Sequence, residues 1–110
     1  MTTDEVLALI TEELTKAEAK HPVWPENRLR QVAIIVEEAG EVLQAALNII
    51  ETEEALVKRE LAGYDVTLAY NGMARLEEQL QKEVAQTGAM AVRWLINRHP
   101  LYANAENRPK

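Results

Sequence analysis

The chain has 110 residues, which is enough for one domain and not for two. Hydrophobic residues make up 47% and aromatic residues only 5%, so the core is expected to consist of aliphatic side chains. A net charge of −6 repels nucleic-acid backbones, which argues against a partner that is a nucleic-acid polymer. The absence of cysteine excludes disulfides and thiolate metal sites.

No charged-then-apolar leader and no run of 18 apolar residues is present in the sequence. We therefore expect neither secretion nor a membrane partner, and we take a cytoplasmic location as the starting assumption. A domain of this size buries a modest share of its surface, so we also expect a homo-oligomer, either a dimer or a tetramer.

The spacing of apolar residues, proline and glycine predicts an all-α protein, a four- to five-helix bundle with long antiparallel core helices. The first helix is expected over about 3–20, begun by a capping box from Thr2 to Glu5 and stopped by Pro22. A second helix is expected over about 26–50, with Pro25 in its first turn. Its residues 32–36 are apolar on every face and are expected to be buried all round. Its main apolar stripe is Leu29, Val32, Val36, Leu43, Leu47 and Ile50.

A third helix is expected over about 53–70, with Thr52 as a plausible N-cap. Whether this helix continues from the second stays open, and the polar residues 51–54 are the candidate break. Asn71 and Gly72 predict a turn, and a fourth helix is expected over about 73–98, ended by Pro100. Residues 1–100 are thus expected to form one helical domain, followed by a frayed polar tail at 101–110.

Three glutamates on the second helix, Glu37, Glu38 and Glu41, are the main candidates for function. At about 100° per residue they share roughly a 100° arc, where like charges repel unless a cation lies among them. Ile34 and Ala45 continue the same strip, so the carboxylates interrupt residues that are expected to be buried, and buried carboxylates must be paired or bound to metal. The alternative is an ordinary solvated acidic face.

Gly40 lies between these glutamates, inside the predicted helix. Glycine in a helix costs about 1 kcal/mol relative to alanine, and its use is to let another backbone or a ligand approach closely. Gly40 therefore predicts a close approach beside the carboxylates.

A metal site needs further ligands from a facing element, and the sequence offers two sets. Glu83 lies on an apolar strip of the fourth helix, with Gln86 one turn on. Glu60 and Asp65 form the second set, which is otherwise explained as scattered charges on an amphipathic helix. Oxygen ligands alone favour Mg²⁺, with Mn²⁺ possible.

The chain resembles the MazG-like all-α nucleoside triphosphate pyrophosphohydrolases, whose signature is EExxE followed by ExxD on a later core helix. It is most similar to a small bacterial and phage branch of that superfamily. The resemblance rests on HPVWP at 21–25, EEAGEVLQAAL at 37–47 and EVAQTGAMAVRWL at 83–95. Two features depart from the pattern. Gln86 stands where the ExxD aspartate is expected, and the stretch from about 50 to 80 is longer and contains ELAGYD at 60–65.

The resemblance implies a Mg²⁺-dependent pyrophosphohydrolase that cleaves a nucleoside triphosphate to a monophosphate and pyrophosphate. It implies that Glu37, Glu38, Glu41 and Glu83, with Gln86, hold the metal, and that Glu38 and Glu41 are catalytic. Trp24 is a candidate to stack on the base, or else to pack in the core. Lys82 and Arg93 are candidates to bind phosphate oxygens, although Arg93 could equally be a surface charge. The alternatives are a non-catalytic helical oligomerisation module and a hydrolase of another phosphate ester.

Overall fold

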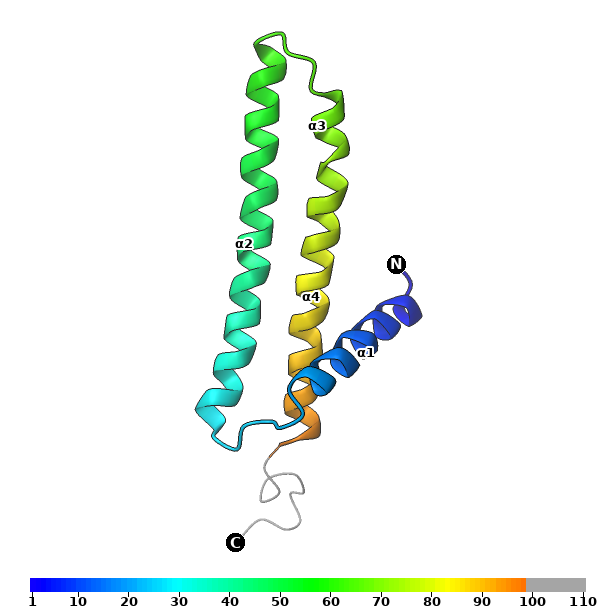
Figure 1. The fold of residues 1–110 in the computed structure, drawn as a ribbon, viewed down its shortest axis with the longest axis vertical. Coiled ribbons are helices and arrows are strands. Elements are labelled where there is room, and N and C mark those ends of the chain that lie inside the picture. Colours follow the sequence, from blue (N-terminus) through cyan, green and yellow to red (C-terminus); the bar gives the residue numbers. More distant parts are fainter. Residues whose placement is uncertain (99–110) are drawn as a thin grey trace, which may run out of the picture.

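The computed structural model describes residues 1–98, and 99–110, including the predicted tail, lie outside the described residues. The chain forms α1 (Thr3–Lys20), α2 (Arg28–Leu61), α3 (Thr67–Asn71) and α4 (Met73–Ile96). No strand occurs within residues 1–98, which confirms the all-α prediction. In that part of the chain there are three long helices and one of five residues (Figure 1). None of the described helices is both long enough and apolar enough to cross a membrane.

α2 and α4 run antiparallel as a long hairpin (Figure 1). α2 passes through 51–54 without a break, so the second predicted helix and the start of the third are one element. The hydroxyl of Thr52 donates to the carbonyl oxygen of Asn48 over 2.7 Å inside this helix, so the prediction of an N-cap there is wrong. The continuous α2 is what sets the length of the hairpin.

The chain reverses after Leu61, where the sequence had predicted helix as far as Tyr70. Gly63 has a φ of +89°, and its N–H donates to the carbonyl oxygen of Glu60 at 3.0 Å. The next N–H, that of Tyr64, donates to the carbonyl oxygen of Arg59, also at 3.0 Å. This pair of bonds around a left-handed glycine closes a helix C-terminus, so glycine ends α2 here.

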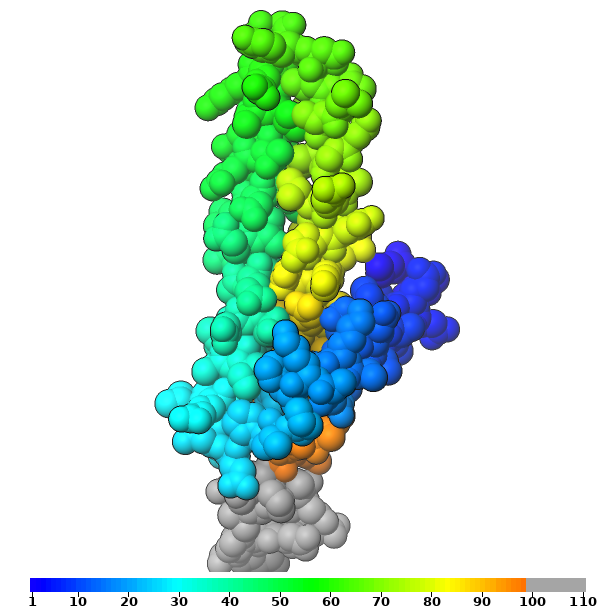
Figure 2. Space-filling view, viewed as in Figure 1, coloured from blue at the N-terminus to red at the C-terminus, as the bar shows by residue number. Residues whose placement is uncertain are grey.

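α1 lies across α4 near the end where α4 finishes, and Figure 2 shows it covering one side of the hairpin there. Gly88 lies under this crossing, because a Cβ on it would meet the side chain of Ile10 at 3.4 Å. At the start of α1, Thr2 Oγ1 accepts a hydrogen bond from the N–H of Glu5 at 3.1 Å, which is half of the predicted capping box. α2 begins at Arg28 behind an Asn27 cap, so Pro25 lies before the helix and not in its first turn.

The buried face of α2 is not the one expected from the sequence. Ala45 and Leu56 are buried and Ile34 is half-buried, whereas Leu43, in the middle of the predicted main stripe, is 62% exposed. Residues 32–36 are not buried all round either, since Val36 is 62% exposed. In the described chain α2 packs mainly against α4, so only one face of it is covered. The covered face is the strip that contains the glutamates.

Candidate metal and phosphate site

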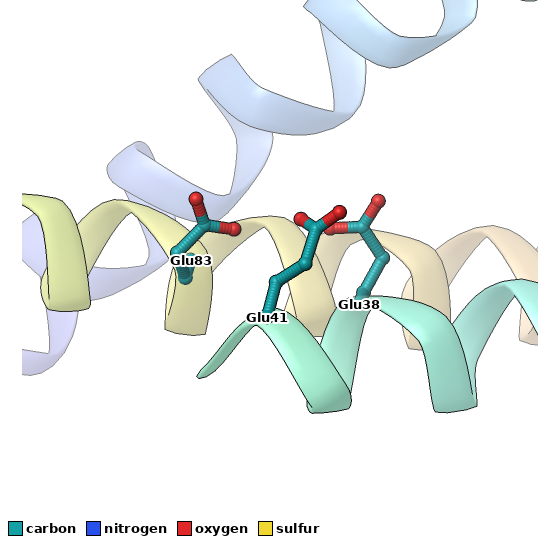
Figure 3. Close-up of side chains that lie close together, drawn as sticks. All are labelled: Glu38, Glu41 and Glu83. Carbon is teal, nitrogen blue, oxygen red and sulfur yellow. The ribbon is translucent and has the colours of Figure 1, made fainter. Parts of the chain in front are cut away.

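Three carboxylates from the two hairpin helices meet at one place. Glu38 and Glu41 extend from α2 and Glu83 from α4, and Figure 3 shows their carboxylates directed toward one another. Each offers an oxygen atom that lies within 4.8 Å of those of the other two. Glu38 and Glu83 are half-buried and Glu41 is exposed. We call these three residues the carboxylate cluster.

The cluster is electrostatically unfavourable in the absence of a cation. Burial raises the pKa of Glu38 above its usual value, and the negative charges of Glu41, Glu83 and Glu37 raise it further. The pKa of Glu41 is raised first by its hydrogen-bonding contact with Glu83 and then by the loss of some of its hydration beside the neighbouring side chains. The Oε2 atoms of Glu38 and Glu83 are buried and receive no hydrogen bond from any residue within 1–98. These oxygens therefore lack the partner that buried carboxylates require.

Two further predicted ligands lie beside the cluster and not within it. Glu37 is exposed and contributes its charge to the environment of Glu38. The side-chain amide of Gln86 donates to Oε2 of Glu13 on α1 at 3.4 Å. Because an amide oxygen is neutral, Gln86 is a weaker ligand than a carboxylate would be at the same position.

A cavity of about 680 Å³ opens next to the cluster, between α1, the loop that follows it, α2 and α4. This volume is within the usual range for small-molecule sites. The side chains predicted to bind metal or substrate that line it are Trp24, Glu37, Glu38, Glu41, Lys82, Gln86 and Arg93. Glu83 belongs to the cluster and is not part of the cavity wall.

Arg93 also holds the cavity wall together. It is 4% exposed, so it is not a surface charge, and its guanidinium donates to the carbonyl oxygens of Ala17 and His21 where α1 ends. The same guanidinium lies 5.1 Å from the centre of the Trp24 ring, a cation–π distance. Trp24 is half-buried, and its Nε1 atom is buried without a partner in the described chain.

Glu13 on α1 is the site residue that the sequence analysis missed. It is 6% exposed, lines the cavity, accepts from Gln86, and forms an ion pair with Lys16 at 3.6 Å. The signal was present, because Glu13 lies between Ile10 and Ala17 on an apolar strip. The same pattern had drawn attention to Glu38.

The second candidate set of ligands lies elsewhere. Glu60 is 19 residues beyond Glu41 on α2, or about 28 Å along the helix. Its carboxylate accepts from the hydroxyl of Tyr70 at 3.4 Å. Asp65 accepts from the N–H and the hydroxyl of Thr67 at the start of α3, and these bonds lower the pKa of Asp65. Glu60 and Asp65 therefore cannot share a site with Glu38 in this fold.

Gly40 does not have the role expected beside the carboxylates. It is exposed, and no atom lies within 4 Å of the position that a Cβ on it would take. The prediction of a close approach is therefore wrong for the single chain, because Gly40 lies on the side of α2 away from the cluster.

Comparison with family models, with curated proteins and with solved structures finds no match for this chain.

Proposed function

We propose that the chain is a metal-dependent nucleotide pyrophosphohydrolase, which cleaves a nucleoside triphosphate to a monophosphate and pyrophosphate. The observation that supports this most is the position of the carboxylate cluster. Its three acidic side chains converge at the edge of a cavity of about 680 Å³ that also presents Lys82 and Trp24. A site that combines carboxylates, a positively charged lysine and an aromatic ring suits a metal-bound nucleotide.

The residues of the cluster fit a hard divalent ion. Their donors are all oxygens, and two buried carboxylate oxygens have no hydrogen-bond partner within residues 1–98. Mg²⁺, or Mn²⁺, would be held by Glu38, Glu41 and Glu83, with Glu37 at the margin and Gln86 as a weak further ligand. When bound, the ion would neutralise phosphate charge and lower the pKa of a coordinated water.

The roles of the other side chains at the site follow from which bond of the nucleotide is cleaved. A water oxygen attacks the α-phosphorus, the bond from this phosphorus to the α–β bridging oxygen breaks, and pyrophosphate leaves with that oxygen. Glu38 or Glu41 accepts the proton of that water, because these are the two carboxylates of the cluster that line the cavity. Lys82 binds phosphate oxygens. The guanidinium of Arg93 retains N–H groups beyond those that bond the α1 carbonyls, and these can also contact phosphate.

A second candidate is a helical module of the same fold without the chemistry. Gln86 favours it, because this residue replaces an acidic ligand and bonds to Glu13 instead. In either case the proposal includes a cytoplasmic homo-oligomer. One chain contributes three long helices within residues 1–98, so a second copy would supply the helices that a four- to five-helix bundle still needs.

The test is pyrophosphate release from a panel of nucleoside triphosphates, with Mg²⁺ or with EDTA, for the wild type, Glu38→Gln and Glu54→Gln. Glu54 is an exposed glutamate of α2 outside the cluster, so Glu54→Gln makes the same chemical change as a matched control. We expect Mg²⁺-dependent release that Glu38→Gln abolishes and Glu54→Gln retains. No release from any nucleotide, together with no effect of Mg²⁺ on the melting temperature, would overturn the enzyme proposal.

A further inference from the structure

The side of α2 opposite the carboxylate cluster is a continuous apolar surface, which we call the outer face. Along residues 29–50 it carries no charged side chain within about 60° of Leu43 around the helix. Its large side chains are 40% to 78% exposed. They are Leu29, Val32, Val36, Leu43, Leu47 and Ile50. Four of the six are spaced seven residues apart, and the apolar face ends where Glu54 lies on the same side of the helix.

The single chain is elongated and has little core, so the outer face is a large part of its apolar surface. The radius of gyration is 19.4 Å, whereas a compact domain of 110 residues has about 13 Å. No large side chain within residues 1–98 is fully buried. A third of the helix surface from Leu29 to Ile50 is a band about 32 Å long and about 12 Å wide, or roughly 380 Å². The largest apolar patch of an ordinary monomer is about 300–600 Å² and often marks an interaction site, and a stable interface buries about 800 Å² per partner with its polar rim included.

The order of residues on the outer face is symmetric about its centre. Counted from the Ala39–Gly40 junction, Val36 and Leu43 are equally distant, as are Val32 and Leu47 and then Leu29 and Ile50. The residues at the centre are both small, and nothing lies within 4 Å of a Cβ placed on Gly40. A two-fold axis at this junction would set each large apolar side chain of one copy level with a large apolar side chain of the other. Such self-matching is the property of an isologous interface.

We propose that two copies of this chain pair through the outer faces of α2, antiparallel, with the two-fold axis at Ala39 and Gly40. Val36 then lies level with Leu43 of the partner subunit, and the small central residues let the two helices approach closely. The carboxylate clusters lie on the opposite sides of the two α2 helices and stay open to ligand. The pairing rests on the apolar face alone, so it holds or fails independently of the proposed hydrolase activity.

The first test is the molar mass in solution, measured by light scattering and sedimentation across protein concentration. We expect a species of twice the chain's 12.4 kDa, or a multiple of that dimer. Leu43→Glu sets a charge against the apolar Val36 of the partner subunit and should shift the dimer to monomer, by about a hundredfold or more in dissociation constant. Ala55→Glu introduces the same side chain at an exposed position of α2 about 120° from the face, and it should leave the mass unchanged. A wild type that is monomeric at 100 µM, on the order of a weak complex's Kd, would overturn the pairing.

The second test fixes the direction and does not depend on a destabilised variant. The chain has no cysteine, so one introduced thiol reports on one position. Ala39→Cys should form a disulfide-linked dimer under mild oxidation, because the two copies of residue 39 lie beside the axis. In the antiparallel pair the two copies of residue 29 are about 30 Å apart, so Leu29→Cys should not cross-link. Efficient cross-linking of Leu29→Cys, or none for Ala39→Cys, would overturn the antiparallel arrangement.

Discussion

Glu38→Gln should change the stability of this protein in opposite directions with and without a divalent ion. An oxygen of Glu38 lies within 4.8 Å of oxygens from two other carboxylates. At that distance each like-charged pair costs about 1 kcal/mol in a water-like dielectric, and salt reduces this for exposed groups. Removing the charge of Glu38 should therefore stabilise the ion-free protein by about 1–2 kcal/mol, which raises the melting temperature by about 5–10 °C.

With Mg²⁺ present the order should reverse. An ion that binds only the folded protein stabilises it by about 2.7 kcal/mol at a hundredfold excess over its Kd. The wild type gains this, whereas the variant has lost one of the three cluster carboxylates and gains less. The measurement is thermal unfolding followed by circular dichroism at 222 nm, in EDTA and in MgCl₂, at matched ionic strength and fixed protein concentration.

Glu54→Gln is the control, because it removes one negative charge from an exposed position about 24 Å along α2 from Glu38. It should melt close to the wild type in both buffers. If Glu38→Gln melts like the control in EDTA and gains as much from Mg²⁺ as the wild type, the cluster neither repels itself nor holds the ion, and the reasoning fails.

Three other predictions follow from the site. The pKa values of Glu38 and Glu41 are raised above 4.5, so just above that pH the folded protein binds more protons than the unfolded chain does. Its stability should therefore fall as the pH rises through the raised pKa values. Urea unfolding in EDTA at pH 5 and pH 8 measures this change, and an equal free energy of unfolding at the two pH values contradicts it. Arg93→Ala removes the guanidinium that bonds two carbonyl oxygens at the end of α1, of which that of Ala17 keeps the N–H of His21 as a donor. It should cost about 2–4 kcal/mol in the free energy of unfolding, and a loss below about 0.5 kcal/mol would show that Arg93 does not hold α1 in place. Gln86→Asp puts a second carboxylate beside Glu13, so it should lower the melting temperature in EDTA and enlarge the rise in melting temperature that Mg²⁺ produces. Isothermal titration with MgCl₂ should show that the variant binds Mg²⁺ more tightly than the wild type. An unchanged affinity would refute a ligand position at residue 86.

The local signals in the sequence were sufficient for α1 and for the start of α4. The first helix was predicted over 3–20 and is observed at Thr3–Lys20, because a capping threonine and a proline mark its ends. The fourth was predicted from 73 and begins at Met73. The reversal at Gly63 was missed, although a glycine after a long helical pattern is a common C-terminal signal.

The side of α2 that would be buried could not be predicted from periodicity. This helix carries two apolar strips on opposite sides, and the uninterrupted one looked like the core. The structure buries the strip that contains Glu38 and Glu41, because α4 is the main neighbour that α2 has in the described chain. Which strip meets which neighbour depends on tertiary arrangement, which a pattern within one helix does not encode. The glutamates were nonetheless found, since they break an apolar strip.

α1 contributes two of the lysines that line the cavity, and α4 contributes Lys82 and Arg93. The carboxylate cluster belongs entirely to α2 and α4, whereas Lys16 and Lys20 belong to α1, which packs against α4. If the proposed function holds, substitutions at Lys16 and Lys20 would change the charge of the cavity wall and leave the carboxylate cluster intact. Related proteins could diverge in selectivity by changing about twenty N-terminal residues, and a library of α1 sequences on a constant hairpin would be a direct way to search for new specificities.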